Sequence, residues 1–363
     1  MSSAAGEHSS PSMGSSPRRA ADRPYQRGYA TPPQERRAVA DAHATKLWLS
    51  ALLAMVDQAV IVMIVIGCAW PVLWTGWHIL AGLAVSGLGA VLLGRQFRAL
   101  ECMAHEASHH NWTRVNRRLN DLLATVLACV PTGARLGVYR ASHLRHHRRF
   151  GTREDPDLAN YRQFGWEELD RASILSFALD SLSRTRAYRR RWKETSGGLG
   201  RLPAIPFLWA VVLAIGPAGL VWGSWPAAFA AAGVWLLGYG VLLPVVRFLG
   251  ECNEHVYTGS QTVFDATISN LGLMSRIFIH PHGDGYHTVH HLWPGVPHHQ
   301  IRNLHRRLVV NDPEGYTARL RHRTRFLSSP VRGLQPDARA GRWTHRRQSR
   351  HASIAGDRYE QRR

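Results

Sequence analysis

The sequence contains few cysteines, and no two of them are closely spaced. Among 363 residues only Cys68, Cys102, Cys129 and Cys252 occur, and there is no C-x-x-C pair. A scattered set of this kind favours neither a disulfide framework nor a cysteine-based zinc site. The first residues also lack the apolar stretch of a secretory signal, so no such signal is expected.

Lysine and arginine are absent from two long apolar regions, although the chain carries 45 of them against 25 acidic residues. The first region runs from Leu47 to Gly94 with Asp57 as its one formal charge, and the second runs from Leu202 to Val246. Each is long enough for two spans of the ~20 residues that a bilayer requires. Breaks rich in Trp, Pro and Gly divide both regions. The predicted membrane-spanning helices are roughly 47–69, 74–95, 203–222 and 226–246.

The distribution of positive charge predicts the orientation of these helices. All Lys and Arg residues lie before, between or after the two apolar regions. Under the positive-inside rule, both termini and both large polar regions then face the cytoplasm, at the plasma membrane if the source is bacterial. A biased genome composition would explain the number of arginines but not their absence from the turns. The predicted fold class is an all-α integral membrane protein, with four transmembrane helices in two hairpins and a cytoplasmic helical cap.

The two ends of the chain differ in composition from its middle. Residues 1–44 are rich in Ser, Pro, Ala and Arg, and residues 326–363 are rich in Arg, Gln and Ser. Neither end can bury enough apolar surface to order itself, so both are predicted to be disordered basic tails around a membrane domain at 45–320. Within the first span, Asp57 is either a functional residue or one that is paired inside the bundle or lies near the interface.

Histidines cluster in the polar regions that follow the apolar ones. "HEASH" places His105 and His109 one helical turn apart, a spacing also found in zinc peptidases. "HLRHH" at 143–147 and "HTVHH" at 287–291 each put three imidazoles on one helical face, and His255 follows the last span. A single His-rich run is as often surface decoration as a site, but all four groups lie on the same predicted side of the membrane.

These groups supply nine imidazoles, whereas one zinc ion needs only three or four protein ligands. Nine imidazoles suit two metal ions that each keep an open position. Nitrogen-rich open sites favour iron and oxygen chemistry, although imidazole also suits zinc, copper and nickel. The candidate metal ligands are His105, His109, His143, His146, His147, His255, His287, His290 and His291. The histidines interpreted as surface or structural residues are His110, His280, His282, His298, His299 and His305.

Taken together, the H-x-x-x-H box and the two H-x-x-H-H boxes resemble those of the membrane-bound fatty acid desaturase and hydroxylase superfamily. "HLRHHRRFGTREDPD" and "HHLWPGVPHH" are similar to the acyl-lipid desaturase branch. The resemblance covers about residues 47–310. It implies four transmembrane helices under a cytoplasmic cap, a histidine-ligated centre of two iron ions, O2 as co-substrate, and attack on a C–H bond of an acyl chain.

The resemblance also bears on the other site residues. Family members use a histidine between the last span and the third box, which corresponds to His255. Some place an asparagine four residues earlier, where this sequence has Glu251. No heme-binding H-P-G-G occurs, so a separate electron donor such as a ferredoxin with its reductase is implied. Side chains expected to orient the imidazoles through their second nitrogen are Glu106, Asp155, Asp157, Asn253 and Glu254, although a plain turn or helix cap is an equal interpretation of Asp155-Pro156-Asp157.

The predicted function is a membrane di-iron oxidoreductase that uses O2 and external electrons to introduce a double bond into a fatty acyl chain. Hydroxylation or ketone formation on a lipid or a specialised metabolite is the alternative, because the same ligands serve all three outcomes. A zinc membrane peptidase would explain only the first box, and a metal transporter would place its ligands inside the spans. The basic ends carry no nucleic-acid readout module. The apolar segments 121–133 and 268–279 are expected at the membrane interface.

Overall fold

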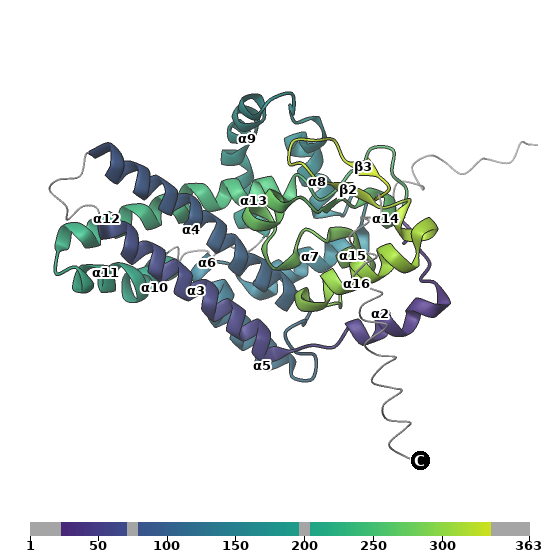
Figure 1. Ribbon diagram of the computed structural model, residues 1–363, viewed down its shortest axis with the longest axis horizontal. Helices are drawn as coiled ribbons and strands as arrows, with labels where there is room; N and C mark the ends of the chain where they lie inside the picture. The colour runs from purple at the N-terminus through teal and green to yellow at the C-terminus, as the bar shows by residue number, and fades with distance from the viewer. Residues whose placement is uncertain (1–22, 71–78, 196–203, 335–363) are drawn as a thin grey trace, which may run out of the picture.

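Long helices form one end of the molecule, and shorter helices with a small sheet form the other (Figure 1). The computed structural model describes residues 23–70, 79–195 and 204–334. Within these ranges, four helices are long and apolar enough to cross a membrane: Leu47–Ala69, Leu80–Ser108, Ala204–Val221 and Trp225–Glu251. The prediction of a mostly helical chain with four candidate spans is therefore confirmed.

The bounds of the spans differ from those predicted where polar residues continue a helix. The first, α3 (Leu47–Ala69), has the predicted bounds. The second, α4 (Ile79–Ser108), runs past residue 95 into the first histidine box, and its predicted start at 74 lies outside the described residues. The fourth span extends beyond residue 246 to Glu251. Both extensions bury their polar side chains, Arg98 and Arg247 among them, so the helices do not end where the hydropathy falls.

The third and fourth spans are each built from two helices joined by a π-helical turn. In both, a proline follows within the first turn of the second helix, where its missing N–H disturbs the regular hydrogen-bond ladder. The third span consists of α10 (Ala204–Ala210), the π turn Val211–Ile215 and α11 (Gly216–Val221). The fourth consists of α12 (Trp225–Leu237), the π turn Gly238–Leu242 and α13 (Leu243–Glu251).

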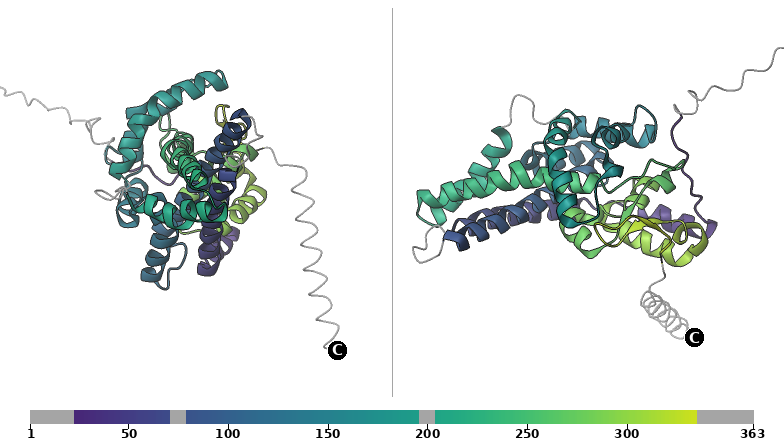
Figure 2. Two further views of the ribbon diagram at one scale, coloured as in Figure 1. Left: turned by 90° about the vertical axis from the view of Figure 1, so that its left-hand side faces the viewer. Right: turned by 90° about the horizontal axis from the view of Figure 1, so that it is seen from above.

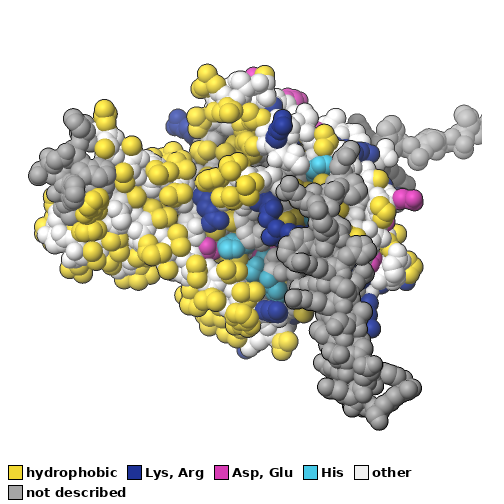
Figure 3. All heavy atoms as spheres, in the orientation of Figure 1, with side chains coloured by type: hydrophobic (Ala, Val, Ile, Leu, Met, Phe, Trp, Pro, Cys, Tyr) yellow, Lys and Arg dark blue, Asp and Glu magenta, His cyan; other side chains and the backbone are white. Residues whose placement is uncertain are grey.

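Glycines allow α4 to lie close to the fourth span. A Cβ atom at Gly94 would lie 2.6 Å from Cβ of Leu242, and a Cβ atom at Gly238 would lie 2.6 Å from Cβ of Leu93. Small residues at crossings let membrane helices approach one another closely. Away from the crossings the long helices expose apolar side chains such as Leu80, and hydrophobic side chains cover this end of the molecule (Figure 3). Such a surface suits contact with lipid.

Asp57 is buried in α3, and polar partners from other elements surround it. Its carboxylate accepts hydrogen bonds from Gln96 Nε2 at 2.5 Å and from His282 Nε2 at 2.7 Å. A buried carboxylate needs such partners to offset its lost hydration. Of the interpretations given to Asp57, pairing inside the bundle is the one that the structure favours.

Between the second and third spans the chain forms a layer of helices beside the bundle. The helix α7 (Leu136–Arg149) forms an angle of 94° with the preceding helical segment, Arg117–Thr132. In the end-on view of Figure 2, α9 lies at the margin of the bundle. The elements are α5 (Arg117–Ala124), the π turn Thr125–Cys129, α6 (Val130–Thr132), α7 (Leu136–Arg149), α8 (Pro156–Phe164), the 3-10 turn Trp166–Glu168 and α9 (Ile174–Thr195).

After the fourth span the chain covers the polar end of the bundle. A small sheet pairs β1 with β2 in parallel and β2 with β3 in antiparallel orientation. The elements are α14 (Val263–Ala266), β1 (Ser269–Asn270), the π turn Ser275–Ile279, the 3-10 turn Pro281–Gly283, α15 (His287–Leu292), α16 (His298–Asn311), the π turn Pro313–Thr317, β2 (Arg321–Arg323) and β3 (Val331–Arg332).

Residues 23–44 differ from the disordered tail predicted for 1–44. Pro33–Glu35 form a 3-10 turn, and α2 (Arg36–Ala42) follows. Glu35 is buried and accepts hydrogen bonds from Arg307 Nε at 2.5 Å and Asn311 Nδ2 at 2.8 Å, both on α16. Specific pairing with a distant helix thus orders a segment whose composition is polar. The disordered tail predicted for 326–363 is also wrong in part, because Val331–Arg332 form a strand that pairs with Arg321–Arg323. The remaining tail residues, 1–22 and 335–363, lie outside the described residues.

Candidate metal centre

Four separate parts of the chain bring the nine candidate ligands to one place. His105 lies in the last turn of α4, and His109 follows directly after this helix. α7 carries three of the histidines and α15 another three, while His255 lies in the loop after α13. The histidines on α7 and α15 stand at positions i, i+3 and i+4, so each helix presents its three rings on one side.

Five of the imidazoles form one group, linked by short distances between their Nε2 atoms. His143 Nε2 lies 2.9 Å from His105 Nε2, 2.8 Å from His109 Nε2 and 3.0 Å from His147 Nε2. His290 Nε2 lies 3.0 Å from the Nε2 atoms of both His105 and His147. The five-histidine group therefore consists of His105, His109, His143, His147 and His290.

The remaining four imidazoles form a second group beside the first. His287 Nε2 lies 3.1 Å from His255 Nε2 and 3.0 Å from His291 Nε2, and His291 Nε2 lies 3.3 Å from His146 Nε2. The rings of His147 and His291, one from each group, have centroids 4.4 Å apart. The four-histidine group, His146, His255, His287 and His291, thus adjoins the five-histidine group.

These separations fit metal coordination better than hydrogen bonding between rings. A neutral imidazole nitrogen has either one hydrogen or one lone pair, so His143 Nε2 cannot hydrogen-bond with three other ring nitrogens. Two nitrogens that each lie about 2.1 Å from one ion are about 3.0 Å apart when they are at right angles. The shared approach of Nε2 atoms is therefore the arrangement expected around a metal ion.

Burial holds His290 and His291 in the neutral state that binds metal. Burial, followed by the neighbouring imidazoles, lowers the pKa of His290 and His291 well below the ordinary value, so both rings are neutral at pH 7. His146 differs from them. Burial lowers the pKa of His146, but the carboxylates of Asp157 and Asp155 outweigh burial and raise the pKa to about 9. A positive charge is therefore favoured at this ring.

Carboxylates contact two of the rings on the side away from the convergence points. Nδ1 of His146 lies 2.7 Å from Asp155 Oδ1, and Tyr257 donates a hydrogen bond of 3.0 Å to Asp155 Oδ2. Nδ1 of His105 lies 3.5 Å from Asp284 Oδ1. Carboxylates in this position fix the tautomer and orientation of a metal-binding imidazole. Asp155 also accepts a hydrogen bond from Asp157 N at the start of α8, so it caps a helix and contacts the ring at the same time.

Asp284 is a site residue that the sequence analysis missed. Its Oδ2 accepts a hydrogen bond from Arg98 Nη2 at 2.9 Å and lies 3.3 Å from Nδ1 of His280. His280, interpreted from sequence as structural, therefore contacts the carboxylate that also contacts His105. The signal in the sequence was the acidic residue three positions before His287 in "HGDGYH".

The other residues expected to orient imidazoles have different surroundings. Asp157 Oδ2 lies 3.4 Å from His146 Nε2, on the side where the rings converge, and Glu254 Oε2 lies 3.9 Å from His287 Nε2. Glu106 instead accepts hydrogen bonds from Asn111 Nδ2 and from the backbone N–H of His298. Asn253 accepts hydrogen bonds from Arg171 and Arg323. Within the described residues, neither Glu106 nor Asn253 hydrogen-bonds to any of the nine rings.

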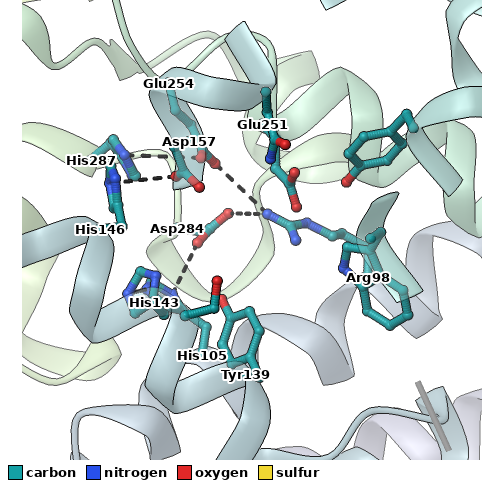
Figure 4. A pocket seen from close by; sticks show the side chains of 14 residues that line it. Arg98, His105, Tyr139, His143, His146, Asp157, Glu251, Glu254, Asp284 and His287 are labelled. Carbon is teal, nitrogen blue, oxygen red and sulfur yellow. Dashed lines mark hydrogen bonds and ion pairs between the residues drawn. The ribbon is translucent and has the colours of Figure 1, made fainter. Parts of the chain in front are cut away.

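A cavity of about 70 Å³ adjoins both histidine groups (Figure 4). His105, His143, His146 and His287 form part of its wall. Its other lining residues are mostly polar and include Arg98, Tyr139, Asp157, Glu251, Glu254 and Asp284. Glu251, which stands where the family resemblance places asparagine in some members, thus lines this cavity beside the candidate metal centre. A molecule in the cavity would lie next to both groups of imidazoles.

The histidines interpreted as structural or surface residues do not join the two groups. His298 Nε2 lies 3.1 Å from Ser50 Oγ, and His305 Nδ1 lies 2.9 Å from the hydroxyl of Tyr316. His282 bonds Asp57, and His110 Nδ1 lies 3.6 Å from Asp121. Position within a motif, and not the number of histidines in a run, therefore separates these residues from the candidate ligands.

Comparison with known proteins agrees with this geometry. The model of the fatty acid desaturase family matches residues 82–324, and the chain belongs to this family. The resemblance drawn from the histidine boxes is thus confirmed, and it identifies the chain as a desaturase-like oxidoreductase.

Two characterised proteins give more particular matches. The dihydrorhizobitoxine desaturase of Bradyrhizobium elkanii is 24% identical over an alignment of 256 positions, and the match covers 63% of this chain and 68% of that protein. The Delta(8)-fatty-acid desaturase of Euglena gracilis is 30% identical over 104 residues, which are 28% of this chain and 25% of that protein. The first match covers most of both chains, and the second covers only a quarter of its relative.

Proposed function

We propose that this chain is a membrane desaturase that holds two iron ions and uses O2 and external electrons to introduce a double bond into a fatty acyl chain. The observation that carries the proposal is the pair of adjoining imidazole groups, one of five rings and one of four. In the overall reaction, two neighbouring carbons each lose a hydrogen. Together with O2, two electrons and two protons, this yields a carbon–carbon double bond and two molecules of water.

Iron bound by the nine imidazoles would supply the activation of O2 and the removal of hydrogen from carbon. The protein keeps the ligands in place for this chemistry. Asp155 accepts a hydrogen bond from Nδ1 of His146, and Asp284 lies close to Nδ1 of His105. Both contacts direct Nε2 of the ring toward the other imidazoles. Eight of the nine rings belong to or directly follow helices, and burial of the site limits the access of bulk water to a reactive centre.

We orient the chain with its four spans as two hairpins, α3 with α4 and the third span with the fourth. Both termini and the histidine groups face the cytoplasm. The absence of Lys and Arg from the two apolar regions supports this orientation. Electrons then come from a cytoplasmic donor such as a ferredoxin with its reductase. The positive charge of the arginine-rich surface would attract a negatively charged donor.

A second candidate is desaturation, hydroxylation or ketone formation on a specialised metabolite. Two observations favour a substrate other than a bulk lipid. The longer of the two matches is to a dihydrorhizobitoxine desaturase, and the cavity beside the histidines is lined by Asp157, Glu251 and Glu254. A polar lining suits a substrate that carries hydrogen-bonding groups near the reacting carbon.

The zinc-peptidase alternative loses its support from the surroundings of Glu106. In an H-E-x-x-H peptidase the glutamate acts as a general base next to the metal. Here Glu106 hydrogen-bonds Asn111 and the backbone of His298, while His105 and His109 are two of five converging rings. A single zinc ion with three or four ligands would leave the other rings without a role.

The test is expression of the full chain, with a matched ferredoxin and reductase, in a host of known lipid composition. Analysis of fatty acid methyl esters should reveal a new unsaturated species that disappears in His146→Ala. A new hydroxylated lipid would favour the hydroxylase alternative. Unchanged lipids, in cells whose purified chain contains about two irons, would overturn the acyl substrate and favour a specialised metabolite.

A further inference from the structure

The two histidine groups are unequal in the number of nitrogens they offer. One has five converging Nε2 atoms and the other has four. We propose that a carboxylate oxygen of Asp157 binds directly to the ion held by the four-histidine group. That ion would then have four nitrogen ligands and one oxygen ligand, whereas the ion in the five-histidine group would have five nitrogen ligands. The proposal rests on the proposed function, since it assumes that each group holds an ion.

Distances from Asp157 to the rings fit a shared ion and not a hydrogen bond. Oδ2 of Asp157 lies 3.4 Å from Nε2 of His146 and 4.0 Å from Nε2 of His255. Hydrogen bonds between nitrogen and oxygen measure about 2.7–3.2 Å. Two donors that each lie about 2.1 Å from one ion are about 3.0 Å apart at right angles and about 4.2 Å apart on opposite sides. Both separations fall in this range.

The chemistry of His146 calls for a cation between these two atoms. Nδ1 of His146 lies 2.7 Å from Asp155 Oδ1, so Nδ1 carries the proton that this contact requires. In the form of the ring that binds metal, Nε2 carries no proton, so its lone pair faces the Asp157 carboxylate and the two repel each other. A metal ion removes this repulsion. The segment Asp155-Pro156-Asp157 thus puts one carboxylate at each end of the same imidazole.

Charge balance favours an inner carboxylate at this group. Neutral imidazoles leave the charge of buried divalent ions uncompensated, and buried ions need nearby opposite charge. In the five-histidine group the carboxylate of Asp284 contacts His105 at Nδ1, on the outer side of the ring. Asp157 lies on the inner side and also lines the cavity. An anionic ligand stabilises the higher oxidation state, so the two ions would differ in ease of oxidation.

Glu254 is the competing carboxylate, and its contacts weaken its claim. Its Oε2 lies 3.9 Å from Nε2 of His287. Its other oxygen, Oε1, lies 3.8 Å from both Arg98 and His280, which draw the carboxylate away from the convergence point. The shorter distance and the more open position of Asp157 make it the better candidate for direct coordination.

The test uses a thiolate as a reporter of direct coordination. The full chain is purified in detergent, freed of metal and titrated with Co²⁺, first as the native chain, then as Asp157→Cys and Asp155→Cys. A thiolate bound to Co²⁺ produces a charge-transfer absorption in the near ultraviolet. We expect a new band in Asp157→Cys whose final intensity corresponds to one thiolate-bound Co²⁺ per chain, and no new band in Asp155→Cys, whose side chain contacts Nδ1.

The outcomes separate this proposal from the proposed function. If the native chain takes up two ions but Asp157→Cys binds both without a new band, direct ligation by Asp157 is overturned while the di-metal centre stands. A new band in Glu254→Cys alone would overturn it in favour of Glu254. If the native chain binds fewer than two ions, the di-metal function itself fails and this proposal fails with it.

A second measurement covers the case in which Asp157→Cys does not fold. The native chain and Asp157→Asn are loaded anaerobically with ⁵⁷Fe²⁺ and compared by Mössbauer spectroscopy. The native spectrum should contain two distinct ferrous components of equal area, and Asp157→Asn should change only one of them. Two indistinguishable components in the native chain, or an unchanged spectrum in Asp157→Asn, would overturn the proposal.

Discussion

His290 and His298 occur eight positions apart, yet their environments predict opposite consequences of losing the ring. His290 Nε2 lies 3.0 Å from two other candidate ligands, whereas His298 Nε2 lies 3.1 Å from Ser50 Oγ. We expect His290→Ala to lower the iron content of the purified chain from about two ions to about one or fewer, and His298→Ala to leave it near two. Elemental analysis of both variants checks this, and equal losses would refute the division of the histidines into ligands and structural residues.

Asp155 contacts Nδ1 of the proposed ligand His146, on the side of the ring away from the other imidazoles. Loss of Asp155 should therefore weaken the metal site without removing a ligand. Asp155→Asn keeps the size of the side chain but removes the charge that orients the ring. Loss of such outer carboxylates typically lowers metal affinity about 10–100-fold, and we expect a loss of this size at one of the two ions. Tyr257→Phe, which removes only the hydrogen bond to Asp155, serves as the matched control and should have a smaller effect on the same titration.

The convergence of the nine candidate ligands could be predicted from sequence because each belongs to a regularly spaced motif or follows the last span, and their binding of metal stays a prediction. Asp284 precedes the third box by three positions but was not identified, because its role comes from contacts in space with His105, Arg98 and His280. Glu106 was expected beside the rings since it stands between two of them in sequence. On a helix, however, its side chain projects from another face and bonds Asn111 instead.

At the scale of elements, α4 and α13 are joined by a buried ion pair. Arg247 Nε lies 3.0 Å from Glu101 Oε1 and 2.9 Å from Oε2, and the guanidinium lies over the ring of Trp192. Glu101→Gln leaves a buried positive charge without its partner, which typically costs about 3–5 kcal/mol. We expect a clear fall in the thermal unfolding temperature of the detergent-solubilised chain.

The control for this prediction replaces both partners with apolar residues. The double variant Glu101→Leu/Arg247→Met removes both charges of this pair, and Arg98, which lies 3.8 Å from Glu101, keeps its shorter contact with Asp284, so the variant should recover much of the lost stability. A double variant as unstable as Glu101→Gln would mean that the packing of these side chains, and not their charge, holds the two helices together.

The presence of the four apolar helices could be predicted from composition, but the residues at which they end could not. α3 matches its predicted bounds because hydropathy falls at both ends. α4 and α13 extend further because Arg98 and Arg247 find carboxylate partners in the folded chain. Residues 23–44 were predicted to be disordered but are folded for a related reason. Glu35 in this segment pairs with Arg307, which lies more than 270 positions away in the sequence.

For the whole molecule, four spans predict firm membrane attachment and a common side for the termini. The chain should remain in the membrane after alkaline carbonate washing, because the apolar surface of four helices cannot be transferred to water. Single cysteines placed near each terminus should both react with a membrane-impermeant thiol reagent only after the cytoplasmic face has been opened. Labelling of either terminus in intact cells would contradict the proposed orientation.

Metal binding should stabilise the entire fold, because the candidate ligands come from four separate parts of the chain. A ligand that binds only the folded state at 100 times its dissociation constant stabilises it by about 2.7 kcal/mol. We expect removal of iron by a chelator to lower the unfolding temperature of the native chain, and to have much less effect on His290→Ala. An equal shift in the two proteins would indicate that the chelator acts on something other than the histidine groups.

The arrangement of α7 affects how the two ions would be acquired. This one helix gives His143 and His147 to one group and His146 to the other. Capture of the first ion therefore rigidifies the helix on which the second depends, so uptake should show positive cooperativity. When iron is scarce, most chains would then carry either a complete pair or nothing, and few would meet oxygen while holding a single unpaired ion.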